Sequence, residues 1–174
     1  MDINTLANTE TATLAGGCFW CIESAFKDMP GIIKITSGYA GGNTIDPTYI
    51  QVCSGKTGHV EAVQILFNPE IVEFSKLLDR YWLQIDPTDP GGQFADRGSQ
   101  YQTVIFYHSI QQLKTAQNSL KQLSKSGKYN NPIATRIEPF SNFFPAEAYH
   151  QDYANKNPLS YMSYVRNSGR KKSS

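Results

Sequence analysis

The sequence has no long apolar run, no excess of one charge and few cysteines. None of its hydrophobic stretches approaches the ~20 residues that span a bilayer. The N-terminus, Met1-Asp-Ile-Asn-Thr, lacks the basic start and apolar core of a signal peptide. The 16 basic and 15 acidic residues leave a net charge of +1, which offers no electrostatic argument for nucleic acid or an anionic membrane as the main partner. Three cysteines do not make the disulfide framework of a secreted protein. We therefore expect a cytoplasmic protein.

Internal repeats, heptads and low-complexity linkers are also absent, so we expect one domain over residues 1–174, with loose tails at 1–8 and 165–174. A hydrophobic content of 40% is enough for a core without disulfide or metal support. Periodicity predicts an α+β fold in which helices pack on a central mixed sheet. The predicted strands cover 11–15, 32–35, 59–67, 101–107 and 132–137, and the predicted helices cover 18–29, 71–85, 110–123 and a short stretch within 140–153.

What the sequence does contain is a pair of thiols where a predicted strand meets a predicted helix. The run Gly16-Gly17-Cys18-Phe19-Trp20-Cys21 follows the first strand, and Cys18 falls at the helix N-terminus. The free amides and dipole of a helix start favour negative charge and should lower the pKa of this thiol. Cys21 follows one turn later on the same side, where it can form a disulfide once Cys18 has been oxidised. Phe19 and Trp20 would supply an apolar wall beside the thiolate.

This Cys-x-x-Cys pair has other interpretations. It fits half of a zinc site completed by Cys53 and one of the three histidines, His59, His108 and His150. A single Cys-x-x-Cys has poor spacing for structural zinc, so we expect no bound metal. A general thiol-disulfide oxidoreductase using Cys18 and Cys21 is the main alternative, although the thioredoxin-like sequence Trp-Cys-Gly-Pro-Cys is absent. Small buried cysteines without a chemical role are the third interpretation.

A carboxylate on an apolar strand face is the second unusual feature. Glu61 shares a period-two face of the 59–67 strand with Val63, Ile65 and Phe67. Burial disfavours the charged form, so a buried Glu61 would keep its proton and serve as an acid near neutral pH. The alternative is a glutamate at the sheet edge that reaches water or a salt bridge.

Glycine-rich segments predict two loops with polar residues of interest. Residues 37–42 are expected to form a turn that presents Tyr39. The long segment 87–100 is expected to deliver Asp96 and Tyr101 to the start of the next strand.

These features occur together with motifs that span most of the chain, and the sequence resembles the class A peptide methionine sulfoxide reductases. The motifs that carry the resemblance are Gly17-Cys18-Phe19-Trp20, Ser37-Gly38-Tyr39-Ala40-Gly41-Gly42, Pro47-Thr48-Tyr49, Val52-Cys53-Ser54-Gly55, Gly58-His59-Val60-Glu61-Ala62-Val63, Asp86-Pro87-Thr88, Asp96-Arg97-Gly98-Ser99-Gln100-Tyr101 and Tyr149-His150-Gln151.

The resemblance implies a single catalytic domain with a ferredoxin-like two-layer core and long active-site loops. It also implies that Cys18 attacks the S epimer of methionine sulfoxide, free or in proteins and peptides, and becomes a sulfenic acid. Phe19 and Trp20 would then hold the S-methyl group, and Asp96 would belong to the substrate-binding network. Three residues would bind the sulfoxide oxygen: Tyr39, Glu61 and Tyr101. One protonated carboxyl and two phenols suit this task, because a sulfoxide sulfur is a poor electrophile until its oxygen is protonated or hydrogen bonded.

The chain departs from the family pattern in two ways. The residue after Gly-Cys-Phe-Trp is usually glycine, whereas this chain has Cys21, and the resolving cysteines that many members carry near the C-terminus are absent. We therefore predict that Cys21 resolves the Cys18 sulfenic acid, leaving a disulfide for thioredoxin to reduce, with no bound cofactor. Cys53 is the competing thiol, but it occurs in an apolar stretch and is expected to be buried and inert.

Overall fold

The structure, a computed structural model, describes residues 8–170 and centres on one mixed β-sheet. The strand order is β7-β6-β1-β3-β2-β8, and all neighbours are antiparallel except β6 and β7. These strands are β1 (Glu10–Gly16), β2 (Ile32–Ala40), β3 (Val60–Phe67), β6 (Thr103–Tyr107), β7 (Arg136–Pro139) and β8 (Phe143–Pro145). A separate hairpin pairs β4 (Gly92–Gln93) with β5 (Asp96–Arg97). The predicted mixed sheet is confirmed.

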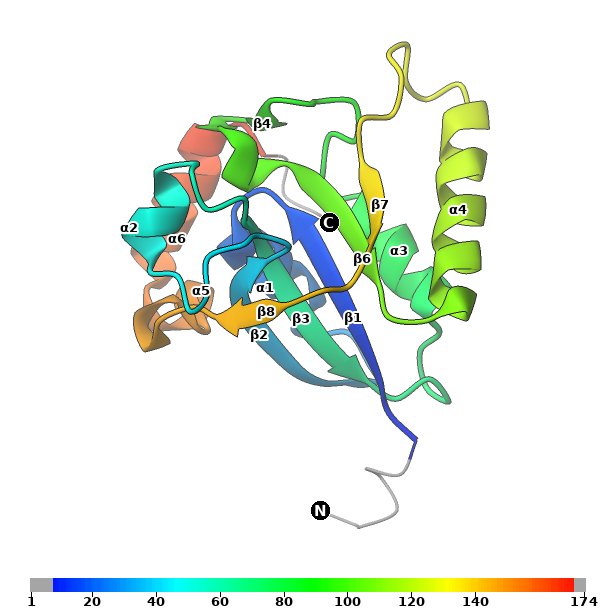
Figure 1. Ribbon diagram of the computed structural model, residues 1–174, viewed down its shortest axis with the longest axis horizontal. Helices are drawn as coiled ribbons and strands as arrows, with labels where there is room; N and C mark the ends of the chain where they lie inside the picture. The colour runs from blue at the N-terminus through cyan, green and yellow to red at the C-terminus, as the bar shows by residue number, and fades with distance from the viewer. Residues whose placement is uncertain (1–7, 171–174) are drawn as a thin grey trace.

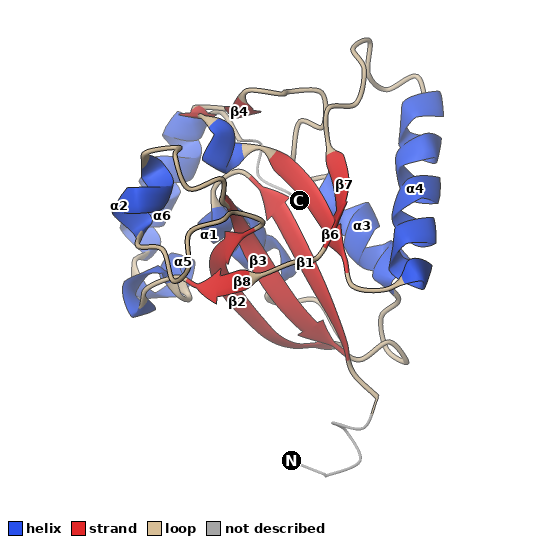
Figure 2. Ribbon diagram, in the orientation of Figure 1, coloured by secondary structure: helices blue, strands red, loops and turns tan. Residues whose placement is uncertain are grey.

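The helices complete a two-layer βαββαβ core (Figure 1). Helices α1 (Phe19–Phe26), α3 (Phe74–Trp82) and α4 (Ile110–Lys125) contact the sheet and, in part, one another. Figure 2 shows the sheet running diagonally through the molecule, with α4 at one side and α6 at the other. The remaining helices are α2 (Tyr49–Cys53), α5 (Tyr153–Lys156), α6 (Pro158–Ser168) and the 3-10 turns η2 (Ser99–Tyr101) and η3 (Ala148–His150). This arrangement confirms the predicted α+β, ferredoxin-like class. None of the helices within residues 8–170 is long and apolar enough to cross a membrane.

Strand alternation divides the core between the two faces of the sheet. Val63, Ile65 and Phe67 of β3 belong to the large cluster that packs against the helices, whereas Val60 and Ala62 belong to a smaller cluster on the other face. Since side chains alternate along a strand, Glu61 points toward the helix layer, as the period-two pattern predicts. This register brings a carboxyl group under the start of α1.

The prediction of a glycine-rich turn at 37–42 is wrong, because β2 continues to Ala40. Tyr39 is therefore a strand residue, fully buried and directly opposite Glu61 on β3. Gly38 does not form a turn. It allows β2 and β8 to pack closely, because a Cβ at this position would lie 2.4 Å from the Phe144 carbonyl oxygen of β8. The glycine thus admits an edge strand that is distant in sequence.

Two other predictions near the C-terminus are also wrong. The 140–153 stretch contains β8 and η3 in place of a single short helix. Residues 165–168, predicted as part of a loose tail, form the last turn of α6, and Ser168 is buried. Pro158 at the first turn and Gly169 at φ +79° mark the two ends of this helix, as proline and glycine commonly do. The remaining predicted tail residues, 1–7 and 171–174, lie outside the described residues.

Smaller differences concern where elements begin. The helix predicted from residue 71 starts at Phe74, after Glu73 as N-cap, and leaves Ile71 exposed. The strand predicted over 132–137 instead runs from Arg136 to Pro139. Element boundaries depend on caps and on pairing partners, which periodicity does not encode.

Candidate active site

The two thiols lie where β1 meets α1, as predicted. Cys18 is the N-cap residue of α1, and its carbonyl oxygen accepts a hydrogen bond from the Cys21 amide at 3.2 Å. Both side chains are nearly fully buried, with 5% and 6% exposed, and the two sulfurs are within hydrogen-bonding reach of each other. No disulfide joins them in this structure.

The expected pKa of Cys18 requires a correction. Burial is the largest influence and raises the pKa of this thiol well above its usual value, and the neighbouring Cys21 and Glu61 raise it further. The helix start does not compensate for the loss of water. By contrast, the pKa of Cys21 is lowered, first by the hydrogen bond from Cys18 and also by the positive charge of Arg170. Of the two thiols, Cys21 is therefore the one whose ionisation its surroundings favour.

Glu61 is the buried carboxyl group that the sequence pattern indicates. Its side chain is only 2% exposed, so the alternative of a solvated glutamate at the sheet edge is wrong. One carboxyl oxygen, Oε2, accepts a hydrogen bond from the Phe19 amide at 3.1 Å. Burial raises the pKa of Glu61 to about 8, and the charges of Asp96 and Cys21 act in the same direction. The carboxyl group is therefore mostly protonated at neutral pH.

A cavity of about 230 Å³ opens over Cys18 and Glu61. Six of its lining residues were predicted as site residues: Cys18, Phe19, Trp20, Glu61, Asp96 and Tyr101. Two more, Tyr49 of α2 and Tyr164 of α6, were missed. Burial raises the pKa of Tyr49 and Tyr101, so both phenols remain hydrogen-bond donors.

Tyr39 is not among the residues that line this cavity. Its hydroxyl donates to Glu147 Oε2 at 2.7 Å, and the other oxygen of Glu147 accepts the Tyr49 amide at 2.7 Å. Glu147 thus holds Tyr39 away from the cavity while it fixes the first residue of α2. The capping box of Thr48 and Gln51 is a sequence signal for the start of α2, but it does not show that Tyr49 faces the cavity.

Trp20 is held rigidly at the rim of the cavity. Its indole stacks on Tyr153, with ring centroids 3.8 Å apart and planes 7° apart. The indole N–H donates to Nδ1 of His150 at 3.2 Å. Burial lowers the pKa of His150, which favours the neutral ring that accepts this bond. The apolar wall therefore has one orientation before any ligand arrives.

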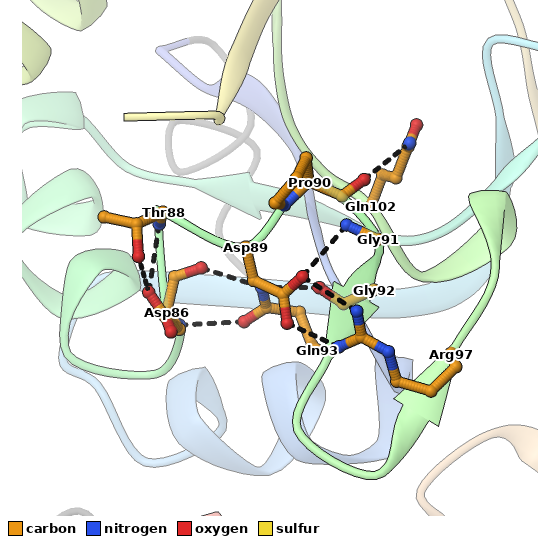
Figure 3. A network of polar contacts seen from close by, with 9 residues as sticks. All are labelled: Asp86, Thr88, Asp89, Pro90, Gly91, Gly92, Gln93, Arg97 and Gln102. Atoms are coloured by element: carbon orange, nitrogen blue, oxygen red, sulfur yellow. Dashed lines mark hydrogen bonds and ion pairs between the residues drawn. The ribbon is translucent and has the colours of Figure 1, made fainter. Parts of the chain in front are cut away.

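The loop that carries Asp96 and Tyr101 is held by a polar network (Figure 3). The fully buried Gln93 accepts the Asp86 amide at 2.8 Å and donates to the Asp86 and Gly92 carbonyls at 2.8 Å each. Arg97, the neighbour of Asp96, forms two hydrogen bonds with the Asp89 carboxylate. The long segment 87–100 is therefore a fixed scaffold that presents Asp96 from β5 and leads into η2, which carries Tyr101.

Helix α6 lies against the thiol pair and was missed as part of the site. Tyr164 donates to the Asp96 carboxylate and is within hydrogen-bonding reach of Cys18, and Tyr161 is within reach of Cys21. Tyr161 and Tyr164 are three residues apart on α6, and Cys18 and Cys21 are three residues apart at the start of α1. One turn of α6 therefore lies beside the first turn of α1, with one tyrosine next to each cysteine.

Two remaining interpretations concern the burial of the third thiol, Cys53, and the zinc site. Cys53, expected to be buried, is only half-buried, and it lies within hydrogen-bonding reach of the Tyr49 and Tyr101 hydroxyls. Among residues 8–170, no three His, Cys, Asp or Glu side chains are grouped so that they could hold a metal ion. The zinc module therefore has no ligand set in this part of the chain.

The sequence profile described as peptide methionine sulfoxide reductase matches residues 10–174. The chain belongs to this family. It is 56% identical to the peptide methionine sulfoxide reductase MsrA 2 of Staphylococcus aureus (strain Mu50), over 93% of this chain and 92% of that protein. Among solved structures, reduced Mxr1 from Saccharomyces cerevisiae superimposes with a TM-score of 0.82 and 35% identity, covering 88% of each chain. Mxr1 in complex with Trx2 has a TM-score of 0.60 and 27% identity, covering 85% of this chain and 86% of that chain. The family assignment and the thiol-lined cavity agree on an enzyme of the class A methionine sulfoxide reductases.

Proposed function

We propose that this enzyme reduces the S epimer of methionine sulfoxide, free or within proteins and peptides, through a sulfenic acid on Cys18. The observation that carries the proposal is the cavity in which the Cys18 thiol meets a protonated Glu61 and the phenols of Tyr49 and Tyr101. At about 230 Å³ it is smaller than the ~300–1,000 Å³ of pockets for whole small ligands. It therefore suits a single side chain, which agrees with a substrate presented by a polypeptide.

In the first step the Cys18 sulfur attacks the sulfoxide sulfur. Glu61 gives its proton to the sulfoxide oxygen, and the Tyr49 and Tyr101 hydroxyls donate hydrogen bonds to it; Asp96 orients Tyr164 beside the reacting sulfur. The S–O bond of the substrate breaks as oxygen is transferred to Cys18. Methionine leaves, Cys18 becomes Cys–SOH, and the thiol proton of Cys18 replaces the one that Glu61 has given. Of the two phenols first predicted, we retain Tyr101 and replace Tyr39 by Tyr49, because Tyr39 is bound to Glu147.

Epimer choice follows from the rigid wall opposite these donors. Phe19 and the stacked Trp20 would hold the S-methyl group, so only one epimer can direct its oxygen to Glu61. The test is dithiothreitol-driven reduction of the separated S and R epimers of a blocked methionine sulfoxide, with the Cys18→Ser variant as the blank. Loss of the S epimer alone is the expected result. Turnover of neither epimer, together with reduction of insulin, would favour the general thiol-disulfide oxidoreductase.

In the second step Cys21 would condense with the Cys18 sulfenic acid. The S–S bond forms, the S–O bond of Cys18 breaks, and the oxygen leaves as water after taking up one proton, which offsets the proton that Cys21 loses when it ionises to the attacking thiolate. An external dithiol, which we take to be thioredoxin, then reduces the disulfide, so no bound cofactor is needed. The complex of the relative Mxr1 with Trx2 supports this choice, and such recycling suits the reducing cytoplasm.

Replacing Cys21 by Ser should separate the two steps. We expect the variant to release about one methionine per enzyme at near wild-type rate, because Cys18 and Glu61 are intact, and then to turn over at least roughly tenfold more slowly with thioredoxin. The matched control is Cys53→Ser, which removes the third thiol and should keep thioredoxin-driven turnover. Peptide mapping after one turnover provides the check: a Cys18–Cys53 bridge in the wild-type enzyme would contradict the role of Cys21.

A further inference from the structure

Arg170, at the C-terminal end of the described residues, reaches back to the turn that carries the thiols. Its Nη2 donates to the Gly16 carbonyl at 2.8 Å, and its Nη1 donates to the Gln84 carbonyl at 3.0 Å. The guanidinium also lies over the Phe94 ring, 4.9 Å from its centroid. One side chain thus joins the end of β1, the segment after α3 and the β4–β5 hairpin.

Gly17 makes this approach possible. The residue has φ +81°, and a Cβ there would lie 2.5 Å from Arg170 Nη2. The guanidinium therefore lies directly against the peptide that precedes Cys18. Its two hydrogen bonds are to neutral carbonyls, and within residues 8–170 it forms no ion pair. Its positive charge is consequently available to groups beyond its hydrogen-bond partners.

We propose that Arg170 is a positioning residue for the second step, in which its guanidinium holds the Gly16–Gly17 turn and presents a positive charge to the Cys21 sulfur as that sulfur attacks Cys18. The inference rests on the proposed role of Cys21. The other titratable groups that the structure places around Cys21 are acids, which are neutral or negatively charged: Cys18 at the start of α1, Glu61 on β3, Asp96 on β5, and Tyr161 and Tyr164 on α6.

The chemistry of the second step explains why a cation is needed there. A thiolate attacks a sulfenic acid far better than a thiol does. The charge of Arg170 lowers the pKa of Cys21 against burial and against the charge of Asp96. Without it, the fraction of Cys21 present as thiolate would fall at neutral and lower pH, while at high pH Cys21 would ionise in any case. The effect of Arg170 therefore has a characteristic dependence on pH.

The test is a single-turnover experiment on the full chain without reductant, from about pH 5.5 to about pH 9. Methionine release reports the first step, and the loss of two titratable thiols reports disulfide formation. For Arg170→Gln we expect methionine release at neutral pH within about twofold of wild type, because loss of the positive charge, which lowers the pKa of Glu61, only keeps Glu61 more fully protonated. Disulfide formation should be slower by roughly tenfold at neutral pH and approach the wild-type rate at high pH, because its pH midpoint moves upward by about one unit.

Two further variants make the result specific. Arg170→Lys keeps the charge but cannot make both guanidinium hydrogen bonds, so its rate of disulfide formation should fall equally at all pH values while its pH midpoint stays at that of wild type. Arg166→Gln removes an exposed arginine of α6 and should leave both steps unchanged. An unshifted pH midpoint in Arg170→Gln, or equal slowing at every pH, would overturn the role assigned to the charge. If the wild-type enzyme itself forms no Cys18–Cys21 disulfide, the proposed second step fails first, and the inference fails with it.

Discussion

Replacing Cys18 by Ser should abolish reduction of the S epimer. A serine hydroxyl in the same buried position is a far weaker nucleophile than a thiol, and its oxygen cannot accept the sulfoxide oxygen to give a sulfenic acid. We expect turnover to fall by roughly 10³-fold or more, to the level of the reaction without enzyme. The measurement is methionine formed from the S epimer with dithiothreitol, which does not depend on the resolving thiol.

The control for this variant is Cys53→Ser, since Cys53 also lies within reach of the cavity tyrosines. It removes a half-buried thiol by the same substitution and should retain most of the dithiothreitol-driven activity. Residual S-epimer activity in Cys18→Ser that disappears when Cys21 is also replaced would show that Cys21, with its lowered pKa, is the nucleophile.

Local patterns predicted the positions of the thiol turn and of the buried Glu61 because the residues that carry each signal are adjacent in sequence or in register. The start of α1 at Cys18 follows from the change of period after paired glycines, and Glu61 stands out because a carboxylate interrupts an apolar strand face. Both signals are contained within fewer than ten residues. Burial of Glu61 then follows from the packing of α1 over this face of β3.

The exchange of Tyr39 for Tyr49 could not be predicted in the same way. Which tyrosine faces the cavity depends on Glu147, about a hundred residues away, which binds the hydroxyl of one and the amide of the other. The strand that brings Glu147 close, β8, has only three residues and pairs with the end of β2. A strand that short has too little alternation to be recognised.

Helix α6 was missed for a related reason. Its apolar residues do not form the single buried stripe by which a helix is usually recognised, since Leu159 and Met162 are exposed. It is joined to the site by phenol hydroxyls and, just beyond its end, by a guanidinium that binds a carbonyl 154 residues away in sequence. Contacts of this kind carry no periodic signal.

Replacing Glu61 by Gln should slow the first step by roughly 10²–10⁴-fold, because the amide cannot give a proton to the sulfoxide oxygen. Substrate binding should survive, since the amide keeps the shape of the protonated carboxyl. In the wild-type enzyme the first step should also slow above about pH 8, where Glu61 loses its proton, and this decline should be absent from the variant. Single-turnover methionine release measured against pH checks both points. A wild-type rate in Glu61→Gln would contradict its role as acid.

The same substitution should stabilise the fold at neutral and higher pH. The pKa of Glu61 is about 8 in the folded protein and about 4.3 in an unfolded chain, so between these values the folded state binds the additional proton. The free energy of unfolding of the wild type must then fall as pH rises through this window, by at most about 1.4 kcal/mol per pH unit from this group. Glu61→Gln has no such proton to lose. Its stability relative to wild type should therefore grow from about pH 5 to about pH 8 and then level off.

Urea unfolding at several pH values measures this difference, with the exposed Glu70→Gln as the matched control. If the two stability curves run parallel, the carboxyl is not held protonated in the fold, and the source of the catalytic proton must be sought elsewhere in the cavity.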